Sequence, residues 1–392
     1  MPAIVENVPR TALVGVTGYG AVHFLHLNKL ADEGECALVS AAVVNPESPA
    51  ASEPLEWLRA HGAAVYPTAE ALFEAERGRL DLVCLPVGIA AHEPLVKAAL
   101  DAGANVLVEK PAAGCVAAVD RMVEAERAAA PRRVFVGFQH VSAPEVGEIR
   151  RVIASGALGA PRIIVVTGIW PRNDGYYARN SWAGRLAAPD GTPVRDSPAN
   201  NAFAHYLNLA LLFASCDPTA PAEPVDVEGA LFRARPEIET FDTCMVRFHT
   251  AGNAEILLCL THTGEKVENP RIRVECERGS VVWRLDGSWE IRGGGDAPHE
   301  PFASGLAASP VETMFRAVCR AVRGEPCSAG LCSLAMARAQ VAAVELLHAK
   351  LPITPVLRSA VRRADGQWIV PGLPEVFGRV WQAGQLELPD WT

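Results

Sequence analysis

The first 140 residues alternate short apolar runs with longer amphipathic stretches. Apolar runs of strand length separated by stretches of helix length are typical of βαβ units, in which helices cover both faces of a parallel sheet. The predicted strands are Thr11–Val16, Ala37–Val44, Asp81–Pro86, Ala104–Val108 and Val134–Phe138. The predicted helices cover residues 24–33, 53–61, 92–102 and 115–129. This pattern predicts a doubly wound α/β domain over residues 1–140.

A glycine turn joins the first predicted strand to the first predicted helix. Gly18 and Gly20 allow a sharp turn and leave room for a pyrophosphate on the free N–H groups and positive dipole end of the helix. The third glycine of the dinucleotide-binding fingerprint is replaced by His23. The turn alone leaves an ordinary strand-to-helix connection open, but its place in a βαβ pattern favours nucleotide binding.

The pattern changes after residue 160 to successive strand candidates. They cover residues 162–170, 225–233, 240–248, 254–263, 271–277, 280–284 and 289–292. Turns such as Ala251-Gly252-Asn253 join neighbouring candidates, as in an antiparallel sheet. The chain of 392 residues also exceeds what one core usually fills. We predict a second, α+β domain over residues 141–392 with a large, mostly antiparallel open sheet. Its C-terminal tail from Val356 onward is rich in tryptophan and proline, and the sequence leaves open whether it covers the sheet or a neighbour's site.

Charge and cysteine content restrict the setting. A net charge of -9 provides no basic stripe for nucleic acid. No run of about eighteen apolar residues occurs, and residues 1–6 lack the pattern of a secretion signal, so a cytoplasmic protein without a membrane segment is expected. The ten cysteines are typical of buried, reduced thiols. Cys327 and Cys332 as half of a metal site is the alternative, but no metal centre is predicted.

The segment Glu109-Lys110-Pro111 places a lysine directly after a predicted strand. Ligands of doubly wound folds bind at the carboxyl ends of the strands, so Lys110 is a candidate site residue. The alternative is a surface cation paired with Glu109.

These segments together resemble the Gfo/Idh/MocA family, named after glucose-fructose oxidoreductase, inositol dehydrogenase and a rhizopine-catabolism protein. The motifs that carry the resemblance are Gly18-Tyr19-Gly20, His26, Pro86 with His92, Glu109-Lys110-Pro111, Gly137-Phe138-Gln139 and the Ser-Gly-x-Leu-Gly turn within residues 149–159. The match covers residues 1–165 and weakens beyond them.

The resemblance implies an NAD(P)-dependent oxidoreductase acting on CH–OH groups of a sugar, polyol or related hydroxy compound. Such a reaction needs a base for the hydroxyl proton as the hydride leaves. The implied catalytic residues are Lys110, His205 and Asn201. The implied cofactor-binding residues are Gly18, Tyr19, Gly20, Ala21, Val22, Asn45, Pro86, His92, Glu109, Lys110 and Gln139.

The chain departs from the family pattern around His205. Relatives of inositol dehydrogenase carry an aspartate four residues before this histidine, where the chain has Asn201, and Asn208 occupies a second acidic position. We expect Asn201, His205 and Asn208 on one helix face. A neutral amide stabilises an imidazolium less than a carboxylate does, so His205 should be a weaker base. Asp196 could compensate if its loop folds inward; a purely structural role for His205 stays open.

A segment rich in aromatic residues and arginines is the predicted substrate loop. Rings and guanidinium groups suit the C–H faces and hydroxyls of a sugar-like molecule. The candidates are Tyr177, Arg179, Trp182 and Arg185. A surface loop anchored by Trp170 and Trp182 is the alternative.

Cofactor choice depends on the end of the second strand. Asn45 replaces the acidic residue that binds the adenosine ribose, and Glu47 follows closely. No Arg or Lys lies between residues 30 and 58 to attract a 2′-phosphate, so NAD is favoured and NADP stays open.

Two other functions remain open at this stage. One is a glycosidase or lyase of the same family, in which tightly held NAD oxidises the sugar transiently. The other is a sensor that binds cofactor and ligand without catalysis, which Asn201 and Asn208 favour. The resemblance also implies a homodimer or homotetramer that pairs through the open face of the second sheet. The identity of the substrate cannot be read from the sequence.

Overall fold

The computed structural model describes residues 8–293, 309–327 and 330–391, which form two compact units. The described part of the first unit consists of residues 8–113, 117–143, 309–327 and 330–334. The second unit contains residues 114–116, 144–293 and 335–391. A division at residue 140 alone would leave residues 309–334 in the second domain, whereas they pack with the first unit.

The first unit is built on a parallel sheet in the order β3-β2-β1-β4-β5-β6. The strands are β1 Arg10–Val14, β2 Ala37–Ala42, β3 Ala64–Tyr66, β4 Leu82–Leu85, β5 Asn105–Val108 and β6 Val134–Val136. The chain moves outward from β1 to β3 and then crosses to β4, so the strand order reverses between β1 and β4. Ligands of doubly wound sheets bind beyond the carboxyl ends of the strands at such a switch point. The predicted α/β fold is confirmed.

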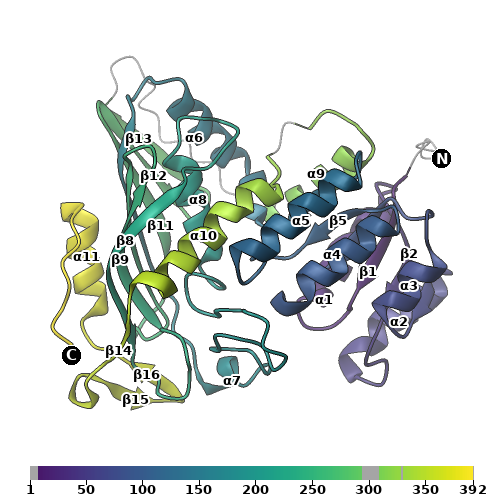
Figure 1. Cartoon of the computed structure of the whole chain (residues 1–392), viewed down its shortest axis with the longest axis horizontal. Helices are drawn as coiled ribbons and strands as arrows, with labels where there is room; N and C mark the ends of the chain where they lie inside the picture. Colours follow the sequence, from purple (N-terminus) through teal and green to yellow (C-terminus); the bar gives the residue numbers. More distant parts are fainter. Residues whose placement is uncertain (1–7, 294–308, 328–329, 392) are drawn as a thin grey trace. The chain divides into compact units, whose positions relative to one another are not determined.

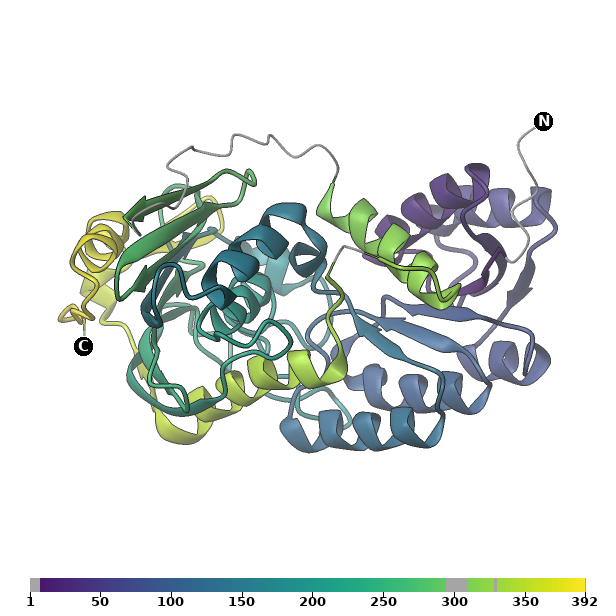
Figure 2. The same ribbon diagram turned by 90° about the horizontal axis from the view of Figure 1, so that it is seen from above.

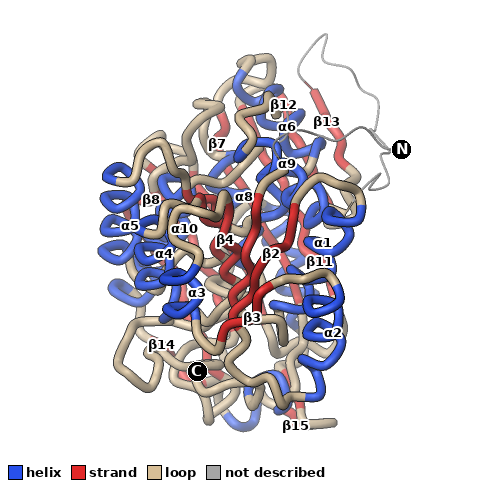
Figure 3. Tube along the Cα trace, turned by 90° about the vertical axis from the view of Figure 1, so that its right-hand side faces the viewer, coloured by secondary structure: helices blue, strands red, loops and turns tan. Residues whose placement is uncertain are grey.

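Helices cover both faces of this sheet. They are α1 Gly20–Asp32, α2 Ser52–Ala60, α3 Ala69–Ala75, α4 His92–Asp101 and α5 Val116–Ala128. Figure 3 shows α1 and α2 on one side of the strands and α3, α4 and α5 on the other. The central strands β4 and β5 are buried at every residue, which explains why both are apolar apart from Asn105.

A helix from far along the chain completes the first unit. Helix α9, Pro310–Val322, lies beside α1 (Figure 2) and places Phe315 and Val318 in the same core as Leu27. At the rim, Lys29 and Glu312 form an ion pair of 2.8 Å, and Arg316 pairs with two glutamates that follow α1, Glu33 and Glu35. The core of the first unit is therefore not local in sequence.

The second unit contains an eight-stranded sheet in the order β13-β12-β11-β7-β10-β9-β8-β14. The strands are β7 Pro161–Ile169, β8 Pro224–Arg233, β9 Thr243–Thr250, β10 Glu255–Thr261, β11 Glu268–Cys276, β12 Gly279–Arg284, β13 Trp289–Gly293 and β14 Ile353–Pro355. The sheet is mostly antiparallel, as predicted. Two pairs are parallel. Strand β7 inserts between β10 and β11 and runs parallel to β10, and the short strand β14 adds parallel to β8 at the edge of the sheet.

One face of the eight-stranded sheet carries α8, Ala204–Phe213, which packs between the sheet and α6, Pro144–Ala154. Every residue of α8 is buried, as expected for a helix that is apolar on most sides, and His205 and Asn208 are its buried polar residues. Figure 1 shows α8 and α10, Leu334–Lys350, on the side of the sheet opposite to α11, Leu373–Ala383.

The C-terminal segment covers the other face. Residues 356–391 place Val356, Val370, Phe377 and Trp391 against apolar side chains of β7 to β10 such as Met245. This segment also contains a two-stranded sheet of β15, Arg362–Ala364, and β16, Gln367–Ile369. We call residues 356–391 the C-terminal cover.

Three further observations concern the described residues. None of their helices is long and apolar enough to cross a membrane. All ten cysteines lie among them as free thiols. No group of three or more His, Cys, Asp or Glu side chains that could hold a metal ion lies in the described part of the chain.

Candidate functional site

The glycine turn lies at the carboxyl end of β1, at the switch point of the sheet. Gly18 has φ +60°, a left-handed conformation that favours glycine, and a Cβ on it would meet no atom within 4 Å. A Cβ on Gly20 would lie 2.3 Å from the backbone oxygen of Gly15. The first turn of α1 contains no acidic residue that would repel a phosphate. The turn therefore fits a dinucleotide, with a bare backbone before the helix N-terminus.

His23, at the third fingerprint position, is fully buried. Its Nε2 lies 2.9 Å from Oε1 of Glu109, and its ring stands edge-on to Phe315 with centroids 4.9 Å apart. A glycine at this position would leave room for close packing of helix on strand. In this chain a histidine instead connects α1, α9 and the end of β5.

Glu109 is buried beneath the chain that carries Lys110. Its Oε1 contacts His23, and its Oε2 accepts a hydrogen bond of 3.1 Å from the backbone N–H of Lys110. A Cβ on Gly137 would lie 2.7 Å from Oε1, so a larger residue there would displace this carboxylate from its position. Lys110 itself is half-buried at the end of β5 and precedes a cis proline. The carboxylate thus holds the backbone of Lys110, which makes Glu109 more than a surface partner.

His92 connects two loops of the same edge. Its Nδ1 lies 3.0 Å from the carbonyl oxygen of Pro111, and its Nε2 lies 3.1 Å from that of Val87. Burial lowers its pKa from the usual range. Because His92 is fully buried, it acts on a ligand only through the backbone that it holds.

The other cofactor candidates follow the ends of neighbouring strands. Asn45 is exposed after β2, Pro86 follows β4, and Gln139 is half-buried after β6. Tyr19 is 43% exposed and precedes α1, whose first residues are Gly20, Ala21 and Val22. The parallel sheet therefore brings the predicted cofactor candidates of the first unit to one edge, apart from the buried His92.

In the second unit, Asp196 folds inward. Its carboxylate is 3% exposed and accepts hydrogen bonds from the side chain of Asn201 at 2.7 Å and the backbone N–H of Gly184 at 2.6 Å. Arg179 lies 3.5 Å from the same carboxylate. The sequence did not determine whether the loop that carries Asp196 folds inward. In the structure it does, and it places a buried carboxylate next to Asn201.

The expected common helix face is only partly present. Asn201 lies in the turn before α8, while His205 and Asn208 lie within the helix. Residues 201–203 do not join the helix because the chain still turns there, with the N–H of Phe203 bonded to the carbonyl of Pro198. The side-chain amide of Asn208 is fully buried and makes no hydrogen bond within the described chain.

Three of the four substrate-loop candidates meet around Tyr176, since Tyr177 stands edge-on to the Tyr176 ring with centroids 5.1 Å apart. The guanidinium of Arg179 is 3.7 Å from the ring centroid of Tyr176 and 5.3 Å from that of Trp182. Arg235 also lies over the Tyr177 ring. Arg185 is the exception, because it pairs with Glu239 at 2.9 Å. The cluster of Arg179, Trp182 and Asp196 includes Tyr176, which sequence reasoning missed although it lies within the predicted loop.

Buried histidines make acid sensitivity a testable property of the fold. Burial lowers the pKa of His262 to about 3 and those of His140 and His348 to about 4. Because these values lie below the unfolded value of 6.5, the unfolded chain binds more protons in acid. The three neutral histidines leave the free energy of unfolding at its full value above pH 6.5. As the pH falls toward 4, each of them lowers the free energy of unfolding by about 1.4 kcal/mol per pH unit.

Asp242 opposes this trend, since burial raises its pKa to about 6 and its contribution is lost as the pH rises through that value. Burial also raises the pKa of Glu126 and Glu145, and it lowers that of His92. The buried histidines outnumber these carboxyl groups, so we expect the free energy of unfolding, measured with urea, to fall between pH 6.5 and 5. His262→Gln should flatten the slope, whereas the exposed His61→Gln should not. A slope that is unchanged in His262→Gln would contradict the assignment.

Two family models match the chain. An oxidoreductase family with an NAD-binding Rossmann fold matches residues 10–138, and the Gfo/Idh/MocA C-terminal domain matches residues 146–282. Together the two models cover more than half of the chain. The protein belongs to the Gfo/Idh/MocA family, and its first unit is an NAD-binding Rossmann domain.

Curated relatives match mainly the first unit. Inositol 2-dehydrogenase 4 of Saccharopolyspora erythraea is 42% identical over 89 residues, which are 23% of this chain and 26% of the relative. Inositol 2-dehydrogenase of Corynebacterium glutamicum strain R is 31% identical over 146 residues, or 37% of this chain and 42% of the relative. The chain thus spans less than half the length of these two relatives.

Solved structures share the fold over most of the chain. The WlbA dehydrogenase of Bordetella pertussis, in complex with NADH and UDP-GlcNAcA, has a TM-score of 0.71 with 21% identity. The alignment covers 88% of this chain and 96% of that chain. At this identity the similarity establishes the fold alone.

Proposed function

We propose that the protein is an NAD(P)-dependent oxidoreductase that transfers a hydride between a nicotinamide and a CH–OH group of a sugar, polyol or related hydroxy compound. The observation that carries the proposal is that Lys110 and the glycine turn lie at the same carboxyl edge of the parallel sheet. Membership of a family with inositol dehydrogenases among its members supports it.

Each proposed residue has a separate task. A bound nicotinamide would supply or accept the hydride. The ammonium group of Lys110 would orient and polarise the reacting oxygen, and Glu109 would hold the lysine backbone through its N–H. His205, 8% exposed at the start of α8, would accept the hydroxyl proton.

The charge that assists His205 differs from the family pattern. The amide of Asn201 occupies the aspartate position and donates a hydrogen bond to Asp196. The nearest carboxylate therefore lies one hydrogen bond beyond the position where relatives have their aspartate. A more distant charge raises the basicity of a histidine less. We propose that Asp196 and Asn201 together replace the missing aspartate, at the expense of a weaker base.

Exchanging the acid and the amide tests this arrangement. Asn201→Asp alone would place two carboxylates about 2.7 Å apart, and like charges so close raise one pKa strongly. In the single variant the two carboxylates should therefore share one proton, and the basicity of His205 should rise little. The double variant Asn201→Asp with Asp196→Asn keeps one charge and should shift the acidic limb of the rate profile upward. A single variant that shifts the limb as far as the double variant would contradict the coupling.

A sensor without catalysis is the second candidate, favoured by Asn201 and by the buried amide of Asn208. A panel of sugars, polyols and hydroxy acids with NAD separates the two functions. Steady reduction of NAD supports the dehydrogenase and, through net turnover of free cofactor, excludes a glycosidase or lyase. If no compound of the panel reduces NAD or NADP and His205→Ala leaves ligand binding unchanged, the sensor function replaces the dehydrogenase proposal.

The compartment, cofactor preference and oligomeric state of the proposed enzyme each follow from one or two observations. Ten free thiols suit the reducing cytoplasm. Asn45 and the absence of nearby Arg or Lys favour NAD over NADP. A homodimer or homotetramer stays part of the proposal, but the C-terminal cover occupies one sheet face and the helices occupy the other. Pairing on the covered side would therefore use the outer surface of the cover.

A further inference from the structure

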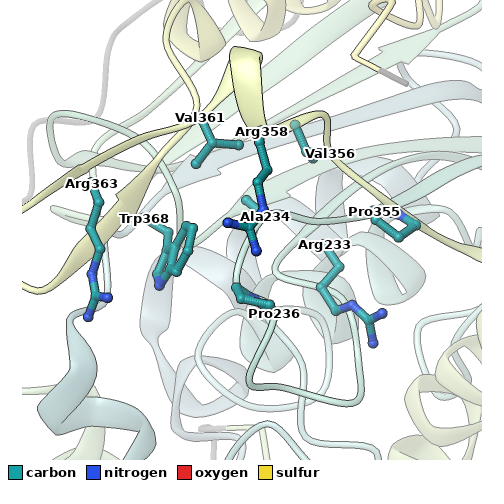
Figure 4. A pocket seen from close by; sticks show the side chains of 9 residues that line it. All are labelled: Arg233, Ala234, Pro236, Pro355, Val356, Arg358, Val361, Arg363 and Trp368. Atoms are coloured by element: carbon teal, nitrogen blue, oxygen red, sulfur yellow. The ribbon is translucent and has the colours of Figure 1, made fainter.

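The second unit contains a cavity of about 350 Å³ between the end of β8 and the C-terminal cover. Figure 4 shows the side chains that line it. They are Arg233, Ala234, Pro236, Pro355, Val356, Arg358, Val361, Arg363 and Trp368. We call this cavity the arginine pocket. Its volume is within the range of small-molecule sites.

The lining of the pocket carries three guanidinium groups and no carboxylate. Arg363 pairs with Asp174 at 2.8 Å, outside the lining. Arg233 donates only to the carbonyl oxygen of Ile238, at 3.2 Å, and Arg358 has no ion pair or hydrogen bond from its side chain within the described residues. Two cationic groups thus lack a carboxylate partner in a chain whose net charge is -9. An anionic ligand would supply that partner.

A flat apolar surface lies beside these charges. In Figure 4 the Trp368 ring lies between Arg363 and Arg358, with Pro236 below and Val361 above. The guanidinium of Arg363 is 5.3 Å from the ring centroid of Trp368, so a cation already occupies one side of the indole. The rest of the lining combines apolar walls with charge, which suits a ligand with a ring and an anionic group.

The wall formed by residues 233–236 is held in place before any ligand binds. Asp242 is buried and accepts hydrogen bonds from the backbone N–H groups of Ala234, at 3.0 Å, and Arg235, at 2.8 Å. Arg235 in turn donates to Asp174 at 2.6 Å and to the carbonyl of Gly366 at 3.1 Å. This network joins the sheet to the β15–β16 hairpin, and a pre-organised site loses less entropy on binding.

We propose that the arginine pocket binds a phosphate ester that carries a flat ring, as nucleoside phosphates do. The planar fork of arginine matches the oxygens of a phosphate, and Arg358 is the group that the phosphate would pair with first. The ring would lie against Trp368 and Pro236, since base–aromatic stacking is favourable for any base. The lining residues all belong to the second unit, and the pocket shares none of them with the glycine turn.

Calorimetric titration of the whole chain tests the charge requirement. Cytidine 5′-monophosphate is the probe, because its base differs from the adenine of the cofactor. Arg358→Gln should weaken its binding tenfold or more, as expected for the loss of one charged hydrogen bond. Arg362→Gln is the matched control, since Arg362 lies beside Arg363 but pairs with Glu265 outside the pocket. Equal affinities in the two variants, or no binding to the unchanged chain, would overturn the proposal.

Parts of the same ligand test the ring requirement. Ribose 5-phosphate and inorganic phosphate carry the anion without the base, and cytidine carries the base without the anion. Each should bind at least tenfold more weakly than the nucleotide, and Trp368→Leu should weaken only the nucleotide and the nucleoside. If inorganic phosphate binds as tightly as the nucleotide, the ring assignment is wrong. Because the measurement needs no turnover, its result is independent of whether the dehydrogenase proposal holds.

Discussion

Replacing Lys110 with alanine is expected to lower turnover by a factor of a hundred or more, while the affinity for NAD changes little. A hundredfold loss corresponds to about 2.7 kcal/mol of transition-state stabilisation. The reason is that the ammonium group would interact most strongly with the oxygen as charge develops on it, not with the bound cofactor. Turnover by steady-state kinetics and NAD affinity by calorimetry separate these two effects.

Lys97→Ala is the matched control, because Lys97 is exposed on α4 in the same unit, away from the strand ends. It should keep both turnover and cofactor affinity. Equal turnover in Lys110→Ala and the unchanged protein would return Lys110 to the role of a surface cation. A joint loss of turnover and NAD affinity would instead indicate that the lysine supports the cofactor site.

The strands of the first unit could be predicted because a buried parallel strand is apolar at nearly every position. Strand β3 and helix α3 were missed. Val65 is 38% exposed, and β3 has only three residues, so no apolar run marks it. Helix α3 has seven residues and covers only the edge of the sheet. Short elements at an edge bury too little surface to leave a periodic pattern.

The place of α9 could not be predicted either. Pro310 after Ser309 and the spacing of Met314, Phe315 and Val318 are typical of an amphipathic helix start. Nothing local tells which core such a helix joins, because Phe315 meets its partners His23 and His26 only in the folded chain. The same applies to the C-terminal cover, whose apolar residues match a sheet face formed by other segments.

The candidate site also contains residues that could be located from the sequence and contacts that could not. Lys110 and the glycine turn could be located because all parallel strands end at one edge. The pairing of Asp196 with Asn201 could not, because it depends on how the loop before α8 folds around Gly184 and Arg179. The pairing of His23 with Glu109 joins residues 86 positions apart and follows from a departure from the family pattern.

A single methyl group at position 20 is expected to disrupt the cofactor site. In Gly20→Ala the new Cβ would lie 2.3 Å from the oxygen and 2.8 Å from the carbon of the Gly15 carbonyl, and both are backbone atoms that cannot rotate away. The turn must therefore open, and NAD affinity should fall well over tenfold, which corresponds to about 1.4 kcal/mol or more. Gly147→Ala is the control, because its Cβ would meet nothing within 4 Å and alanine favours a helix. Calorimetry that gives the same NAD affinity for both variants would remove the glycine turn from the cofactor site.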